Sequence, residues 1–263
     1  MRRLLWIGLL VAFLMPAATI AQDAISGTWK TDLSNPQLPK KPDVYQLKDG
    51  MYTCKTCAPP FEVKADGQDQ KVSGHPYFDT LSVKVVDDRT VEMSQKKDGK
   101  LNGTSKMMVS PDGKTMVFEF SDSSATNGDP VTGKIEATRV GKAPAGEHAI
   151  SGSWRTTKYD TISDNGLVVT FKLDGDTLMM SSPTGQSYAA KLDGTEAPYK
   201  GDPGTTSVSV KKMGKDTIEE TDKRDGKVIG VTRMKVSADG KTMTFDNVDK
   251  LHGTTSQFTA TKQ

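Results

Sequence analysis

Cysteine and histidine are scarce in this 263-residue chain, which contains two cysteines and three histidines. Two cysteines are too few for a framework of disulfides, so an apolar core has to hold the fold together. The histidines, His75, His148 and His252, are scattered, and no further Cys or His pair supplies the four ligands of a zinc site. We therefore expect no metal ion and no cofactor.

Sequence signatures of catalysis are also missing. No Gly-rich phosphate loop occurs, and no nucleophile elbow frames any of the many Ser and Thr residues. The adjacent acids Asp87-Asp88 and Glu219-Glu220 are interpreted as turn or surface residues. The sequence therefore favours a protein that is not an enzyme.

An excess of charge of either sign is missing as well. The chain has 35 Lys and Arg against 33 Asp and Glu, and Arg2 and Arg3 precede the mature chain predicted below. Without those two residues the charges balance. A net charge of zero argues against nucleic acid or an anionic membrane surface as the main partner.

Only one long hydrophobic run occurs, from Leu4 to Met15. It is shorter than the ~20 residues of a membrane-spanning helix, it is broken by Pro16, and small residues lead from there to Ala21. We expect a signal peptide at 1–21, cleavage before Gln22, and export to the periplasm or out of a bacterial cell. An uncleaved anchor is the alternative. No stable membrane insertion is expected after cleavage.

The clearest positive signal is an internal repeat. Ala24–Trp29 (AISGTW) returns as Ala149–Trp154 (AISGSW), 125 residues later. Val109–Met116 (VSPDGKTM) returns as Val236–Met243 (VSADGKTM), and intervening matches keep their order. The repeat predicts two domains of one fold: copy one at 22–140, a linker at 141–148, and copy two at 149–263.

Each repeat reads as antiparallel β-sheet. Eight Asp-Gly pairs, four per repeat, predict hairpin turns, because a tight hairpin needs residues that accept positive φ. The segments between them alternate, as in Met116, Phe118 and Phe120 on one face, and none shows convincing helical periodicity. We predict an all-β protein with two tandem antiparallel up-and-down β-barrels of about eight to ten strands each. An open sandwich and a propeller are the alternatives.

The openings Gly27-Thr28-Trp29 and Gly152-Ser153-Trp154 resemble the Gly-x-Trp opening of lipocalins and related calycin barrels. The resemblance implies that each Trp closes one barrel end against a basic residue of the last strand. Arg139 fits this role in copy one, and Lys262 stands at the matching place in copy two. The late Ser-x-Asp-Gly-Lys-Thr-Met hairpin is similar to that of small exported bacterial proteins described as lipocalin-like, a family without an established activity.

Cys54 and Cys57 form the one motif with possible chemistry. A redox dithiol normally lies at a helix N-terminus, whereas this pair lies between predicted strands and precedes Pro59 and Pro60. A local disulfide in a tight turn is the favoured interpretation, because a bridge needs Cα atoms within ~7 Å. Free thiols and redox or metal chemistry are the alternatives.

Several large apolar side chains are predicted to point into the barrels. Methionine adapts well to apolar ligands, although it also fills gaps in solid cores. We expect an exported, non-enzymatic binding protein that holds a small apolar molecule in one or both barrels. A structural or protein-interaction module of the cell envelope, such as an inhibitor with solid barrel cores and another envelope protein as partner, is the alternative, and a thiol redox enzyme is a third. The candidate ligand-binding residues are Met116, Phe118, Met234, Met243 and Phe245.

Overall fold

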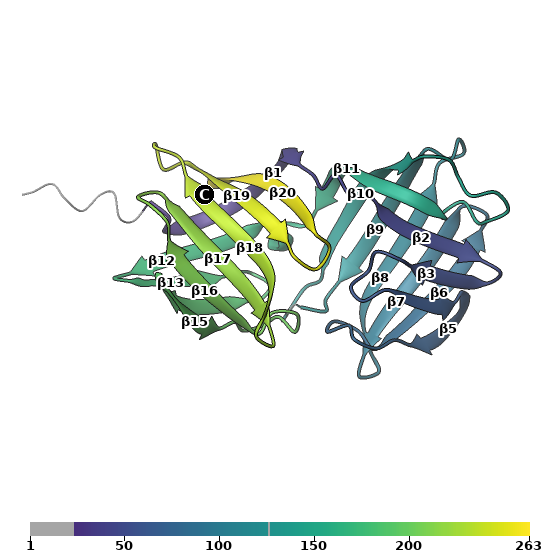
Figure 1. Ribbon diagram of the computed structural model, residues 1–263, viewed down its shortest axis with the longest axis horizontal. Helices are drawn as coiled ribbons and strands as arrows, with labels where there is room; N and C mark the ends of the chain where they lie inside the picture. Colours follow the sequence, from purple (N-terminus) through teal and green to yellow (C-terminus); the bar gives the residue numbers. More distant parts are fainter. Residues whose placement is uncertain (1–23, 126) are drawn as a thin grey trace, which may run out of the picture.

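The structure is a computed structural model that describes residues 24–125 and 127–263 (Figure 1). The predicted signal peptide at 1–21 lies outside the described residues. The described chain is all-β, with twenty strands and one short 3-10 helix, η1 (Asp164–Gly166). Within these ranges no helix is both long enough and apolar enough to cross a membrane.

The strands form two antiparallel sheets of ten strands each, and each sheet curls into a nearly closed barrel (Figure 1). The predicted fold class is confirmed. We call the barrel built from β2 to β11 barrel one. Its strands are β2 (Asp43–Lys48), β3 (Met51–Cys54), β4 (Phe61–Lys64), β5 (Asp66–Lys71), β6 (Thr80–Asp87), β7 (Thr90–Lys97), β8 (Lys100–Val109), β9 (Thr115–Asp122), β10 (Val131–Val140) and β11 (Gly152–Ile162).

We call the second barrel barrel two. It combines the C-terminal nine strands with the first strand of the chain, which lies between β12 and β20. Its strands are β1 (Gly27–Gln37), β12 (Val168–Asp174), β13 (Thr177–Ser181), β14 (Ser187–Lys191), β15 (Asp193–Pro198), β16 (Ser207–Lys212), β17 (Thr217–Arg224), β18 (Lys227–Val236), β19 (Thr242–Asp249) and β20 (Thr254–Lys262).

The two repeats therefore exchange their first strands. Strand β1, from copy one, pairs with β12 and β20, and β11, from copy two, pairs with β10 and β2. The predicted domain limits 22–140 and 149–263 follow the sequence repeat and need correction, because they do not coincide with the barrels. A physical reason is that β11 directly follows β10 along the chain, with residues 141–151 between them, and strands adjacent in sequence usually pair.

Each barrel has a core of its own, and the exchanged strand contributes its Trp to that core. Trp29 is fully buried in barrel two beside residues such as Leu178 and Met243. Trp154 is buried in barrel one beside residues such as Val83. Each apolar core is thus completed by a side chain from the other repeat.

The Asp-Gly pairs behave in more than one way. Asp49, Asp98 and Asp225 have φ near 50° and are each followed by a Gly with positive φ, as the hairpin prediction requires. Asp66 and Asp193 instead begin strands β5 and β15, so the prediction of hairpin turns is wrong there. In both cases the Asp carboxylate accepts a hydrogen bond from the backbone N–H two residues later, which offers the chain a different local bend.

A second contact between the barrels lies away from the crossing strands. The hydroxyl of Tyr77 donates to Oδ1 of Asp202 over 3.0 Å. The same hydroxyl lies 2.0 Å from where a Cβ on Gly204 would be, so only glycine fits at that position. The backbone N–H of Asn127 donates to the Thr184 carbonyl oxygen over 3.0 Å. We call the Tyr77–Asp202 contact with Gly204 the latch.

Candidate functional site

An open apolar groove of about 370 Å³ lies where the two exchanged strands approach each other. Strand β1 contributes Thr31 and Leu33, and β11 contributes Tyr159 and Ile162. A groove of this size is within the range that small molecules occupy in proteins. Because both exchanged strands line it, the groove exists only with the crossed connections.

The rest of the groove belongs to barrel two. Leu167, between η1 and β12, lines the groove together with Val168 and Val169 at the start of β12, while β19 and β20 supply Phe245 and Phe258. None of these five side chains reaches full burial. Partly exposed apolar surface gathered in one concave place is typical of a binding site.

Strand pairing explains why these side chains meet. The backbone N–H of Thr31 donates to the Leu167 carbonyl oxygen over 2.9 Å, which holds β1 beside the start of β12. Phe245 and Phe258 are direct cross-strand partners. The ring of Tyr159 reaches across from barrel one and lies 5.9 Å from the Phe258 ring, centre to centre. This separation is normal for a favourable aromatic pair.

Close packing against barrel one fixes the turn between β11 and β12. A Cβ on Gly166 would lie 2.6 Å from Cγ1 of Val131 and 3.2 Å from Cγ2 of Ile162. A Cβ on Gly133 would lie 2.6 Å from Ile162 and 2.6 Å from the Phe120 ring. The small residues therefore let Ile162 lie between the groove and the aromatic side chains of β9.

The groove has few polar groups and no charged ones among its lining residues. Its polar side chains are Thr31, Tyr159 and Asn247. Burial, followed by the nearby Asp43 carboxylate, raises the pKa of Tyr159, so its hydroxyl stays neutral at ordinary pH. A charged ligand would find no counter-charge in this place, so the lining favours a neutral molecule.

The five predicted ligand-binding residues lie in different surroundings. Met116, Met234 and Met243 are at most 3% exposed and fill the barrel cores. Phe118 packs against the core of barrel one, with its ring 5.9 Å from that of Phe120. Of the five, only Phe245 lines the groove.

The predicted barrel-closing residues do meet, but in crossed pairs. Arg139 lies over the ring of Trp154, and Lys262 lies over the ring of Trp29 at 5.2 Å. The resemblance placed each basic residue with the Trp of its own repeat, and this pairing is corrected by the exchange of β1 and β11. A Cβ on Gly27 would lie 2.4 Å from Lys262, and one on Gly152 would lie 2.6 Å from Arg139, so both glycines make room for the basic side chains.

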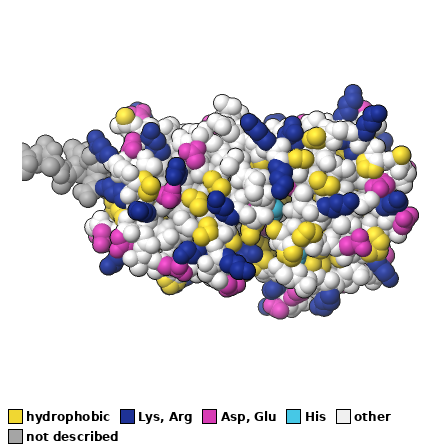
Figure 2. Space-filling model, in the orientation of Figure 1, with side chains coloured by type: hydrophobic (Ala, Val, Ile, Leu, Met, Phe, Trp, Pro, Cys, Tyr) yellow, Lys and Arg dark blue, Asp and Glu magenta, His cyan; other side chains and the backbone are white. Residues whose placement is uncertain are grey.

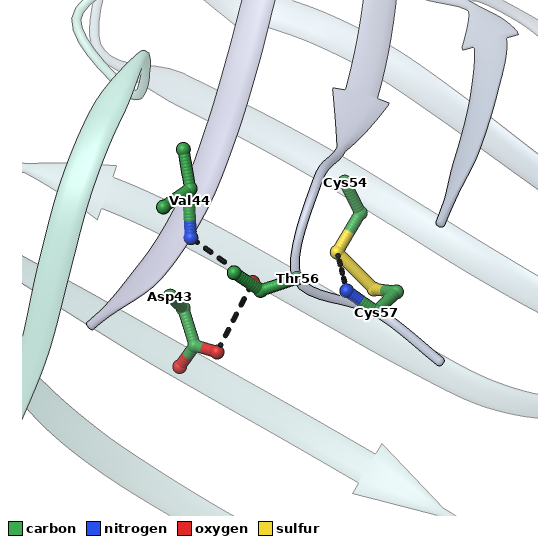
Figure 3. Close-up of a disulfide and its surroundings, with 5 residues drawn as sticks. All are labelled: Asp43, Val44, Cys54, Thr56 and Cys57. Carbon is green, nitrogen blue, oxygen red and sulfur yellow. Dashed lines mark hydrogen bonds between the residues drawn. A yellow bond between two sulfur atoms is a disulfide. The ribbon is translucent and has the colours of Figure 1, made fainter. Parts of the chain in front are cut away.

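Cys54 and Cys57 are joined in a disulfide, with Cα atoms 5.5 Å apart (Figure 3). Cys54 is 1% exposed, whereas Cys57 is only partly buried. Within the same turn the Thr56 hydroxyl accepts from the Val44 N–H over 3.0 Å and donates to Asp43 over 3.4 Å (Figure 3). The bridge therefore closes the turn after β3, as the interpretation of a local disulfide predicts, and the Thr56 hydroxyl ties that turn to strand β2.

Barrel two also holds a group of ionisable side chains around Glu220, which lies on β17 and is desolvated by burial, so its interpretation as a turn or surface residue is wrong. The Tyr188 hydroxyl donates to Glu220, and Asp222 lies two residues further along β17. Burial, followed by the Asp222 carboxylate, raises the pKa of Glu220. Burial, followed by the Asp202 carboxylate, raises the pKa of Asp222. No group of three or more metal-ligating side chains occurs within 24–125 and 127–263.

Most groove residues were missed by the sequence analysis because the strand exchange was not foreseen. Trp29, Thr31 and Leu33 alternate along one face of β1, and that period of two could have identified the last two. Tyr159 and Ile162 lie on β11, whose register with β10 is irregular, so no simple periodicity places them. The groove depends on tertiary pairing more than on any local motif.

Surface charge gives no further indication of a partner. On the face that Figure 2 shows, Lys and Arg side chains are intermixed with Asp and Glu, without a continuous area of one sign. The function of the groove is therefore inferred from its own residues. Among known proteins, no family model matches this chain and no curated protein matches it.

Proposed function

We propose that this protein is an exported, non-enzymatic binding protein that holds a small neutral apolar molecule in the groove between the exchanged strands. The observation that carries the proposal is the groove itself, about 370 Å³ in volume and lined by uncharged side chains from both barrels. Aromatic walls with few polar groups are typical of small-molecule sites.

The two ten-stranded barrels and the Gly-x-Trp openings support a relationship to lipocalin-like proteins. In lipocalins the ligand lies inside the barrel. Here the side chains of Trp29, Met234 and Met243 fill the interior of barrel two, and those of Met107 and Met116 that of barrel one. The proposed ligand site therefore adjoins the core of barrel two, where Tyr159 and Ile162 of barrel one also line it, and does not lie in the filled part of either interior.

Titration with N-phenyl-1-naphthylamine, a neutral apolar fluorophore, tests the proposal. We expect saturable binding to the full chain, with enhanced emission. Leu33→Glu places a carboxylate against the apolar wall, and we expect it to weaken binding at least about tenfold, since an unpaired charge is costly there. Leu101→Glu is the matched control, because Leu101 is 57% exposed on β8, and it should leave binding unchanged.

Two results would overturn the proposal. One is the absence of saturable binding to the unchanged chain. The other is equal binding by the Leu33→Glu and Leu101→Glu variants, which would place the dye elsewhere.

An envelope protein-interaction module is the second candidate function. The observation that favours it is the solid packing of both barrel interiors, where Met107, Met234 and Met243 are at most 2% exposed. Failure of the dye to bind would leave this candidate as the better one. Cross-linking in cells that export the protein, followed by identification of a partner trapped in stoichiometric amount, would test it directly.

A further inference from the structure

Asn247 is the one amide side chain in the groove. It lies on β19, two residues after Phe245, and opposite Ser256 of β20. An Asn amide offers one acceptor oxygen and two N–H donors. Because the groove has so few polar groups, any hydrogen-bond donor or acceptor of this amide without a protein partner indicates which polar group the ligand carries.

The oxygen of the amide is already engaged. The Thr232 hydroxyl donates to Oδ1 of Asn247 over 2.9 Å, which orients the amide. Its nitrogen, Nδ2, donates to the Phe245 carbonyl oxygen at 3.5 Å, the long limit for such a bond. Among residues 24–125 and 127–263, this nitrogen donates to no other acceptor. At least one N–H donor is thus free to meet a ligand.

The sequence repeat supplies an independent argument. At the offset of 127 that relates Val109–Met116 to Val236–Met243, the counterpart of Asn247 is Phe120. Barrel one forms the same strand pairing with an aromatic side chain in this position. The fold therefore does not require an amide there, so the Asn side chain has another use.

We propose that Asn247 is the specificity-determining residue of the groove and donates a hydrogen bond to the carbonyl oxygen of a neutral, apolar ketone or ester. The apolar body of the ligand packs against Leu33, Tyr159 and Phe258, and its single acceptor meets Nδ2. Glu220 is the cross-strand partner of Thr232. It accepts a hydrogen bond from the Tyr188 hydroxyl and does not line the groove. This inference rests on the proposed binding function and adds the chemical class of the ligand.

A pair of probes with one shape tests the assignment. 2-Acetylnaphthalene carries a carbonyl group, whereas 2-isopropenylnaphthalene has a methylene group in place of that oxygen. Their affinities are measured by competition with N-phenyl-1-naphthylamine, for the unchanged chain and for Asn247→Leu. We expect Asn247→Leu to lower the affinity for the ketone by about threefold to tenfold, as one lost hydrogen bond implies. The affinity for the hydrocarbon should stay unchanged or rise slightly.

A second variant and a spectroscopic measurement guard against a folding defect. Asn247→Phe introduces the side chain that repeat one carries at this place, and it should lower ketone affinity more than hydrocarbon affinity if both still enter. Independently, the infrared carbonyl stretch of 2-acetylnaphthalene bound to the unchanged chain should shift to the lower frequency of a hydrogen-bonded ketone, and Asn247→Leu should abolish that shift.

The possible failures are distinguishable. If both probes bind and Asn247→Leu lowers their affinities equally, or if the infrared stretch of the bound carbonyl does not shift, the role of Asn247 is overturned. The proposal that the groove binds an apolar molecule is unaffected by that result. If neither probe binds the unchanged chain, the groove proposal and the role of Asn247 both fall.

Discussion

The guanidinium carbon of Arg139 lies 4.0 Å from the centre of the Trp154 ring, although Arg139 lies at the end of the first sequence repeat and Trp154 at the start of the second. Arg139 also donates to three backbone carbonyl oxygens, those of Gly113, Ser151 and Ala149, over 2.5 to 2.6 Å. Within the described part of the chain, the ammonium group of the corresponding Lys262 donates only to the Ala24 carbonyl oxygen, over 3.2 Å. The same end of the two barrels is therefore closed with unequal strength.

Replacing these basic residues should show that inequality. Arg139→Met removes a cation–π contact and leaves three carbonyl groups without their donor, so we expect a loss of about 2 to 4 kcal/mol in the free energy of unfolding. Lys262→Met should cost about 1 kcal/mol or less. Urea denaturation followed by tryptophan fluorescence measures both. Equal losses would contradict the greater role of Arg139.

The strand exchange predicts that each Trp stabilises the barrel formed mostly by the other repeat. Trp154→Phe leaves a cavity in barrel one and Trp29→Phe leaves one in barrel two, each at a cost of about 1 to 3 kcal/mol. Hydrogen exchange with mass spectrometry can locate the effect in the full chain. We expect Trp154→Phe to accelerate exchange in β6 to β9 and Trp29→Phe to accelerate it in β16 to β19. The opposite assignment would show that each repeat keeps its own first strand.

The sequence predicts which side chains are buried in the barrels better than it predicts which strands belong to each barrel. Alternation places Val208 and Val210 inward, and both are fully buried. The exchange is invisible to such patterns, because Gly27-Thr28-Trp29 and Gly152-Ser153-Trp154 suit either barrel equally well.

Raising the pH from the ordinary carboxyl range to about 8, the raised pKa of Glu220, should weaken barrel two. Its pKa is raised in the folded state, so the folded protein binds a proton that the unfolded chain releases above about pH 4.3. Stability therefore falls as pH rises from the ordinary carboxyl range toward the raised pKa, by at most about 1.4 kcal/mol per pH unit for one group. Glu220→Gln should flatten this decline, as measured by urea denaturation at a series of pH values.

The matched control for that experiment is Glu219→Gln. Glu219 bonds the more exposed Arg233 side chain over 2.8 Å on the other face of β17. Its loss should cost about 0 to 1 kcal/mol without changing the slope of stability against pH. An unchanged slope in Glu220→Gln would show that Glu220 does not cause the decline.

The latch should fix how the barrels sit against each other. Tyr77→Phe removes the hydroxyl that bonds Asp202, at a cost of about 1 to 2 kcal/mol. Gly204→Ala should lower the free energy of unfolding by more, about 1 to 3 kcal/mol, and displace the Tyr77 ring, because the new Cβ would overlap the Tyr77 hydroxyl. Gly214→Ala is the control, since no other group lies within 4 Å of that Cβ. Urea denaturation and small-angle scattering together would detect the change, and similar results for the two glycine variants would refute it.

The candidate site was harder to foresee than the fold. A pattern of inward Met and Phe predicts apolar interiors, and Met234 and Met243 do lie there. It cannot distinguish a filled interior from a cavity, because the sum of packed volumes depends on all strands at once. Leu33, Tyr159 and Phe258 come from distant parts of the chain and meet only through the crossed strands.

The position of β1 imposes an order on biosynthesis. A ribosome makes Gly27–Gln37 first, yet the strands that flank it, β12 and β20, are made after all of barrel one. Barrel one can close as soon as β11 emerges, while the N-terminal strand waits without its neighbours until the last residues of the chain arrive. Until β20 has been made, β1 therefore lacks one of the two neighbours that it pairs with in barrel two.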